Sequence, residues 1–147
     1  IIKTFYLFLL ISTLYTTAWM YKYHPYQYAY FNSLAGKNVI EKFPVDYWGL
    51  SYRESLEELI KIDGTNIIKL FNSSGMKMFY PLLSLSEEDR AKFIIVENLE
   101  DADYWVTNYY VDDFIKKNTS KMNNFKKIID IKVDGNSINT IFKKNEQ

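Results

Sequence analysis

The apolar residues divide the chain into an uncharged N-terminal stretch and a mixed region behind it. Residues 4–21 read TFYLFLLISTLYTTAWMY and carry no charged side chain. About 20 apolar residues in a helix cross the hydrocarbon core of a bilayer, and Ser and Thr hydroxyls can bond to carbonyls of their own helix. The pattern predicts a transmembrane helix over residues 1–23. Aromatic and basic residues at its end suit a headgroup layer: Trp19, Tyr21, Lys22 and Tyr23.

Two other interpretations of this stretch fit less well. A signal peptide has a shorter apolar core and a small-residue cleavage site, and no such site follows here. A buried core helix of this length would be long for so small a domain. Lys3 and Lys22 flank the stretch symmetrically, so charge alone predicts no orientation in the membrane.

Residues 24–45 are expected to form an aromatic juxtamembrane connector. Pro25 ends the apolar helix, because proline removes a backbone donor and restricts the residue before it. Tyr26, Tyr28 and Tyr30 alternate, so the segment either lies along the membrane surface or packs under the domain that follows. Without a flexible Ser/Gly-rich tether, we expect that domain to be held close to the bilayer.

Residues 46–147 are expected to form one soluble domain in which helices and strands alternate. Ser51 and Glu54 have the spacing of a capping box, which predicts a helix that begins there and is closed by Gly64. A Ser cap followed by acids predicts a short helix over 86–92. Apolar runs rich in β-forming residues predict strands at 67–71, 93–96, 102–108, 125–133 and 138–143.

The turn at Asp134-Gly135 favours a C-terminal β-hairpin between the last two of these strands. Helices interleaved with apolar strands indicate an α/β fold of the α+β kind. We therefore expect an N-terminal transmembrane helix followed by a small mixed β-sheet with packed helices and that hairpin.

Composition excludes several classes of function. Lys+Arg and Asp+Glu both number 18, so there is no basic excess for a nucleic-acid partner. Cysteine is absent, and only five glycines are present, in no phosphate-binding motif. A single histidine, His24, cannot by itself make a His-based metal site or a Ser-His-Asp relay.

The carboxylates do not form a complete catalytic constellation. An acidic cluster over 97–103 lacks the regular spacing of a Ca²⁺ loop, so we expect no cofactor within this chain. Asp46 stands among large aromatic residues in the string VDYWG. Its carboxylate is either satisfied by nearby N–H groups or hydrogen-bonds at an interface with another part of the protein.

Two strings carry a family resemblance: HPYQYAYFN at 24–32 and DYWGLSYRE at 46–54. Directly after an apolar helix, they resemble the C-terminal end of bacterial polytopic membrane glycosyltransferases of the GT-C type. These enzymes use polyprenyl-phosphate sugars and are related to protein O-mannosyltransferases. The string ENLEDADYWVTNY at 97–109, with the hairpin behind it, also resembles that tail, so the resemblance covers nearly the whole chain.

The resemblance implies a multi-helix membrane body that takes a sugar from a lipid-phosphate donor at the extracytoplasmic face. The catalytic acids of such enzymes lie in an early loop outside this chain, so it implies no catalytic residue here. The implied partners are the lipid bilayer, the lipid-linked donor, and the remaining transmembrane helices of the enzyme or partner subunits. The candidates for docking the domain on that body are His24, Tyr26, Gln27, Asp46, Tyr47 and Trp48.

Three functional hypotheses follow. In the first, the chain is the last helix and the non-catalytic extracytoplasmic domain of an integral membrane glycosyltransferase. The chain begins with Ile1 rather than Met, so this hypothesis expects sequence upstream. In the second, it is a singly anchored binding or assembly subunit of a membrane complex. In the third, it is a stand-alone enzyme whose site is built from scattered carboxylates and tyrosines.

Overall fold

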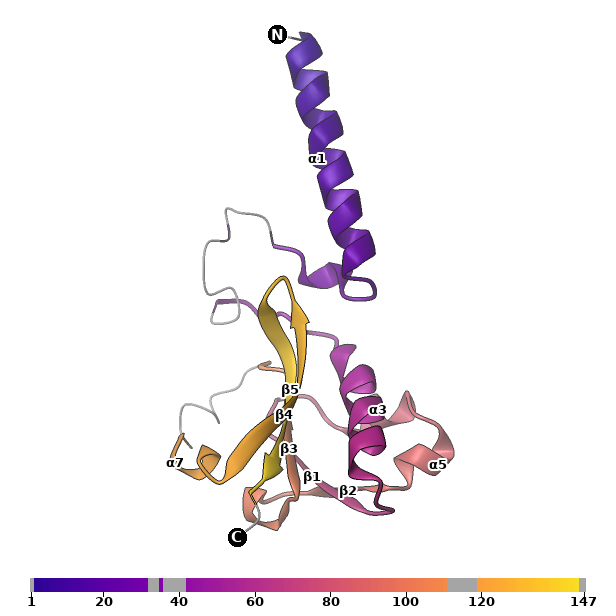
Figure 1. The fold of residues 1–147 in the computed structure, drawn as a ribbon, viewed down its shortest axis with the longest axis vertical. Coiled ribbons are helices and arrows are strands. Elements are labelled where there is room, and N and C mark those ends of the chain that lie inside the picture. The colour runs from indigo at the N-terminus through magenta and orange to yellow at the C-terminus, as the bar shows by residue number, and fades with distance from the viewer. Residues whose placement is uncertain (1, 32–34, 36–41, 111–118, 146–147) are drawn as a thin grey trace.

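The computed structural model describes residues 2–31, 35, 42–110 and 119–145, in which a long helix stands on a small α/β domain (Figure 1). The domain contains one five-stranded mixed sheet with helices packed on it, which confirms the predicted α/β class. The connector and the domain share one core, because Tyr26, Ala29 and Val45 are buried in the same cluster as residues of the sheet.

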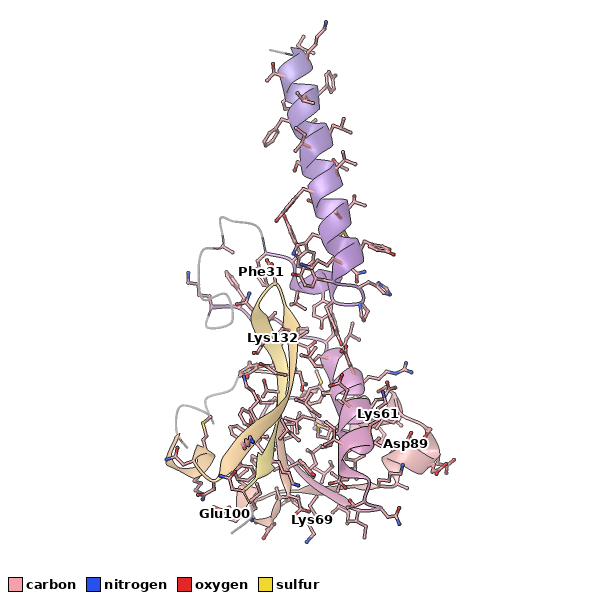
Figure 2. The ribbon with its side chains drawn as sticks, viewed as in Figure 1. Phe31, Lys61, Lys69, Asp89, Glu100 and Lys132 are labelled. Carbon is pink, nitrogen blue, oxygen red and sulfur yellow. The ribbon has the colours of Figure 1, made fainter. Side chains whose placement is uncertain are left out.

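Helix α1 spans Ile2–Lys22, close to the predicted bounds. Its apolar side chains point outward on all sides and are largely exposed (Figure 2). The prediction of a transmembrane span is corrected: across the described part of the chain, no helix combines the length and the apolar character needed to cross a membrane. Hydroxyl-bearing side chains lower the apolar character of α1: Thr4, Tyr6, Ser12, Thr13, Tyr15, Thr16, Thr17 and Tyr21.

The connector folds back against the base of α1 and forms the 3₁₀ helix η1 (Gln27–Ala29). Trp19 is buried, with its ring 4.7 Å from that of Tyr23 and 4.8 Å from that of Tyr30. Trp19 and Tyr23 therefore pack on the protein instead of forming the predicted collar, and Tyr21 stays exposed. Of the two positions expected for the connector tyrosines, the structure shows packing under the domain.

All five predicted strands are present, with the order β2-β1-β3-β5-β4. Strands β1 and β2 and strands β1 and β3 pair in parallel, whereas β5 is antiparallel to both β3 and β4. The predicted hairpin is thus confirmed, and it turns toward the base of α1 (Figure 1). The strands are β1 (Ile68–Asn72), β2 (Phe93–Val96), β3 (Tyr104–Thr107), β4 (Phe125–Val133) and β5 (Asn136–Lys144).

The sheet buries apolar side chains on both faces. Helix α3 (Ser51–Asp63) covers one face, where Leu56 and Leu59 pack in the same core as Ile141. On the other face Trp105 stacks on Phe142, with ring centroids 4.5 Å apart. The short helices η3 (Leu99–Asp101) and α7 (Thr119–Met122) contribute to this second cluster, while α4 (Phe79–Leu83) and α5 (Glu87–Arg90) lie on the connection from β1 to β2.

Helix α3 begins at Ser51 as predicted, but the predicted capping box is wrong. No side chain of the N-cap residue bonds to the helix, and neither Ser51 nor Glu54 turns its side chain to the other's backbone. The Ser51 hydroxyl donates to Asp46, and the Glu54 carboxylate accepts from Tyr26. Asp46 and Tyr26, which lie outside the helix, therefore bind the two side chains that were expected to bond to the backbone at the helix start. The helix ends at Gly64 with a φ of 66°, the left-handed C-cap that the sequence predicts.

Candidate functional site

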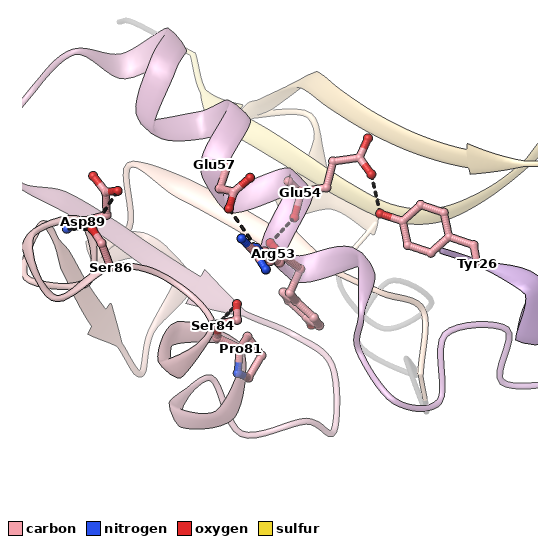
Figure 3. Close-up of polar contacts among 10 residues, drawn as sticks. Tyr26, Arg53, Glu54, Glu57, Pro81, Ser84, Ser86 and Asp89 are labelled. Atoms are coloured by element: carbon pink, nitrogen blue, oxygen red, sulfur yellow. Dashed lines mark hydrogen bonds and ion pairs between the residues drawn. The ribbon is translucent and has the colours of Figure 1, made fainter. Parts of the chain in front are cut away.

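The two strings that carry the family resemblance meet in space. The Tyr28 hydroxyl, from the connector, donates to Oδ1 of Asp46, and the Tyr26 hydroxyl donates to Oε2 of Glu54 on α3. Figure 3 shows Tyr26 reaching Glu54 from the connector, whereas the Arg53–Glu57 ion pair lies separately along α3. We call the five interacting residues the motif junction: Tyr26, Tyr28, Asp46, Ser51 and Glu54.

Asp46 is the centre of the motif junction and is fully buried. Besides the Tyr28 bond, Oδ1 accepts the backbone N–H of Leu50 at 3.1 Å, and Oδ2 accepts the Ser51 hydroxyl. The backbone carbonyl of Asp46 accepts from Nδ2 of Asn108 at 2.8 Å. Asp46 therefore finds its partners within the chain, where it joins the connector, the start of α3 and the segment after β3, and its role at an interface with another part of the protein stays a prediction.

The hydroxyls of Tyr26 and Tyr28 are the hydrogen-bond donors to the carboxylates of the motif junction. Burial raises the pKa of Tyr26, and its hydrogen bond to Glu54 raises it further. Burial also raises the pKa of Tyr28, and the charge of Asp46 adds to this effect. A hydroxyl with a raised pKa keeps its proton at all physiological pH values, so these bonds persist whenever the carboxylates are ionised.

His24 and Gln27 are not part of the motif junction. They pair with each other at the exposed end of α1, where Nε2 of Gln27 and Nδ1 of His24 are 2.6 Å apart. The sequence grouped them with Tyr26 because they are adjacent, but the turn at η1 directs them elsewhere. This pair carries no interaction with the domain in the part of the chain that the structure describes.

Tyr47 and Trp48, next to buried Asp46, point the other way and line a pocket of about 580 Å³. Their rings meet edge to face with centroids 5.0 Å apart, and Tyr47 makes a second edge-to-face contact with Tyr110 at 5.3 Å. Trp48 is 70% exposed. We call this the aromatic pocket, lined by Tyr47, Trp48, Gly75, Met76, Lys77, Tyr80, Pro81 and Tyr110.

The aromatic pocket lies outside the carboxyl ends of the parallel strands β1 and β3. Gly75 follows β1 and donates its N–H to the carbonyl of Tyr110, which follows β3, at 3.2 Å. From β1 the chain continues to β2 at one edge of the sheet, and from β3 it continues toward β4 at the other edge. Such a point of divergence is where open α/β sheets place their ligand sites.

Gly49 of the DYWG string shapes one wall of the aromatic pocket. Its φ of 65° favours glycine, and a Cβ there would lie 2.2 Å from Sδ of Met76. The absence of a side chain lets Met76 pack against the backbone beside Trp48. The DYWG string thus contains the buried Asp46, the two pocket rings Tyr47 and Trp48, and Gly49, against which Met76 packs.

The sequence pointed to only two of the eight residues that line the aromatic pocket, Tyr47 and Trp48. Lys77, Tyr80 and Tyr110 were not among the candidates, because nothing in the sequence around residues 77–80 indicates contact with residue 110. One signal in the sequence could have indicated this contact: turn residues follow both β1 and β3. Because parallel neighbouring strands have their carboxyl ends at the same end of the sheet, the segments after them lie close together.

The acidic cluster over 97–103 is not a metal site in the described residues, because no group of three or more His, Cys, Asp or Glu side chains there could hold an ion. Glu100 instead pairs with Lys121 at 2.6 Å, and Asp101 accepts from Asn98 at 3.2 Å. The described residues that line the aromatic pocket are aromatic or apolar except for Gly75 and Lys77.

Comparisons with models of known protein families, with curated proteins and with solved structures find no match to this chain. The resemblance to GT-C-type glycosyltransferases therefore rests on the residues of the strings themselves.

Proposed function

We propose that this chain is the non-catalytic, extracytoplasmic C-terminal domain of an integral membrane glycosyltransferase that uses a lipid-phosphate sugar donor. The observation that carries the proposal is the motif junction. The strings HPYQYAYFN and DYWGLSYRE carry the resemblance, and the bonds from Tyr28 to Asp46 and from Tyr26 to Glu54 join them. A functional requirement to hold the domain against a neighbouring helix explains why both strings occur together.

The surface of α1 supports a place for it among other helices. Apolar side chains such as Phe8, Leu10 and Leu14 are more than half exposed. Side chains project from α1 around its whole circumference (Figure 2). A helix that is apolar on all sides is normally buried in a larger assembly.

The join between α1 and the domain supports a fixed orientation. Trp19 at the base of α1 belongs to the same buried cluster as Leu56 of α3 and Ile141 of β5. This shared core fixes how the base of α1 meets the domain. Tyr47 and Trp48 of the aromatic pocket directly follow Asp46 of the motif junction in the chain. Of the labelled charged residues, Lys61, Lys69, Asp89 and Glu100 lie away from α1, whereas Lys132 lies on the hairpin that turns toward its base (Figure 2).

The second candidate is a binding or assembly subunit of a membrane complex. The same exposed aromatic residues favour it, because Trp48 and Tyr80 are 70% and 68% exposed. Aromatic side chains of this kind are enriched at protein interfaces. The two candidates differ in what covers α1: other helices of the same polypeptide in the first, and a separate subunit in the second.

The experiment reads the open reading frame upstream of Ile1 and assays membranes that contain its product for sugar transfer from a polyprenyl-phosphate donor. We expect further apolar helices, an acidic pair in the first extracytoplasmic loop, and measurable transfer. A start codon or a short signal directly before Ile1 would overturn the glycosyltransferase and favour the subunit.

A variant pair tests the role of the domain in that assay. We expect Trp48→Ala to reduce transfer about tenfold while leaving the thermal unfolding of the protein unchanged, because this ring is mostly exposed. Tyr21→Ala is the control, since Tyr21 is 87% exposed and is not part of the pocket lining. Equal sugar transfer by the two variants would show that Trp48 does not help to dock the domain.

A further inference from the structure

We infer that the aromatic pocket binds a saccharide ring that carries an anionic group. The inference deepens the proposed function and rests on it, because a glycosyltransferase domain meets saccharides as donor or acceptor. Two sources share this chemistry: a sugar linked to phosphate, as in a lipid-linked donor, and a glycan that contains an acidic sugar.

The dimensions and position of the pocket fit a small ligand. Its volume of about 580 Å³ lies within the range of small-molecule sites, which is roughly 300–1,000 Å³. It lies where the connections after β1 and β3 diverge, and the bond from Gly75 to Tyr110 ties those two connections together. A site on such a rigid edge is formed before the ligand arrives.

The rings of the pocket match the two kinds of surface on a sugar. A sugar ring has an apolar face of C–H groups and an edge of hydroxyls, and Tyr and Trp offer flat apolar faces with one polar tip. The edge-to-face contacts of Tyr47 with Trp48 and with Tyr110 hold three of the rings in place. Tyr80 reaches the pocket from α4 and is 68% exposed.

Charge indicates that the ligand is anionic. Among the lining residues that the structure describes, Lys77 is the only one with a charged side chain. Within the described residues Lys77 takes part in no salt bridge, whereas Lys92, Lys121 and Lys127 each pair with an acid. An exposed ammonium group beside an aromatic surface attracts a phosphate or a carboxylate.

The test measures binding to the complete chain in detergent micelles by calorimetry. The probes are glucose 1-phosphate, glucuronate, the neutral methyl glucoside, and inorganic phosphate alone. We expect both anionic sugars to bind more tightly than methyl glucoside, and inorganic phosphate to bind most weakly. Tighter binding of glucose 1-phosphate than of glucuronate indicates the phosphate-linked source, and the reverse order indicates an acidic glycan.

Two variants separate the contributions of ring and charge. Trp48→Ala should weaken all three sugars about tenfold. Lys77→Gln should weaken only the two anionic sugars, about fivefold, and bring them close to methyl glucoside. The controls are Tyr21→Ala and Lys69→Gln, which change an exposed aromatic and an exposed lysine outside the pocket and should bind like the wild type.

No sugar binding by the wild type, or unchanged binding in Trp48→Ala, overturns the inference. Binding of inorganic phosphate as tight as that of glucose 1-phosphate also overturns it, because the ring then contributes nothing. The proposed function fails separately. If this chain binds sugars but the complete protein transfers none, the binding pocket stands and the proposed glycosyltransferase function fails. If the complete protein transfers sugar but this chain binds none, the proposed function stands and the binding pocket fails.

Discussion

The hydroxyl of Tyr28 donates a hydrogen bond to Oδ1 of Asp46, which joins the connector behind α1 to the start of α3. The same carboxylate oxygen accepts the N–H of Leu50, so one buried group both begins a helix and positions the connector. The effect of losing either function can be measured in unfolding experiments on the complete chain.

The first prediction concerns Tyr28→Phe. The change removes the donor and leaves a buried carboxylate with one partner fewer, so we expect the free energy of unfolding to fall by about 1.5–3 kcal/mol. Urea unfolding followed by tryptophan fluorescence measures this loss. Tyr21→Phe removes a hydroxyl from a side chain that is 87% exposed and should leave the midpoint unchanged. An unchanged midpoint in Tyr28→Phe would show that the hydrogen bond from Tyr28 to Asp46 does not stabilise the fold.

The second prediction compares two glycines with nearly the same backbone conformation. Gly49 and Gly64 have φ values of 65° and 66°, but a Cβ at Gly49 would meet Met76, whereas one at Gly64 would meet nothing within 4 Å. Gly64→Ala should cost only the strain of a positive φ, about 1–2 kcal/mol. Gly49→Ala should cost at least about 1 kcal/mol more, because Met76 must also move. Thermal unfolding compares the two.

The clash at Gly49 has its own control. Met76→Ala removes the side chain that the new Cβ would meet. The cost of Gly49→Ala in that background should therefore approach the cost of Gly64→Ala in the wild type. A cost that stays equally large would place the effect in the backbone rather than in the contact with Met76.

The third prediction concerns acid stability and Asp63. Burial by itself raises the pKa of this carboxyl, but hydrogen bonds from Thr65 and from the Tyr104 hydroxyl at 2.5 Å outweigh burial and lower the pKa below 3.8. The folded state thus holds the proton less tightly than the unfolded state. The stability that Asp63 contributes is complete above the unfolded pKa and is lost as the pH falls through the folded value.

Unfolding at several pH values tests this sign. Asp63→Asn should be less stable than the wild type at pH 7, and the difference should shrink as the pH falls below 3.8. Glu97→Gln, which changes an exposed carboxylate, should follow the wild type throughout. A difference between Asp63→Asn and the wild type that stays constant with pH would contradict the assignment.

The fourth prediction compares two buried asparagines. Both side-chain polar atoms of Asn139 in β5 lack a hydrogen-bond partner in the described structure, whereas Asn108 donates to Asp46 and accepts from the N–H of Tyr110 at 3.2 Å. A buried polar group without a partner costs about 1–3 kcal/mol. Asn139→Leu should therefore raise the free energy of unfolding by that amount, and Asn108→Leu should lower it. Destabilisation by both changes would mean that Asn139 has a role in packing or binding.

Strands were the most predictable part of this fold. The apolar run at Phe93–Val96 and the alternation over Phe125–Val133 appear as strands with the predicted bounds. Both signals act over a few residues, since β-branched and aromatic side chains favour extended backbone locally. The Asp134-Gly135 turn was predictable for the same reason, because its backbone conformation depends on residues within the turn.

Predictions failed where a distant partner outcompeted a neighbour. Ser51 and Glu54 have the spacing of a capping box, yet Asp46 and Tyr26 bind their side chains instead. Trp19 and Tyr23 have the pattern of a membrane collar, yet the connector folds back over Trp19. Local spacing contains no information about a side chain that arrives from another segment.

The sequence by itself determined the long N-terminal helix, the alternating helices and strands, and the hairpin, because these depend on propensities and periodicities within each segment. Only the tertiary structure decided that Tyr28 reaches Asp46 and that Lys77, Tyr80 and Tyr110 join Tyr47 and Trp48 in one pocket. In the first case a connector side chain reaches a residue 18 positions away, which local spacing does not encode. In the second case the parallel pairing of β1 with β3 brings together the carboxyl ends of strands that are distant in sequence.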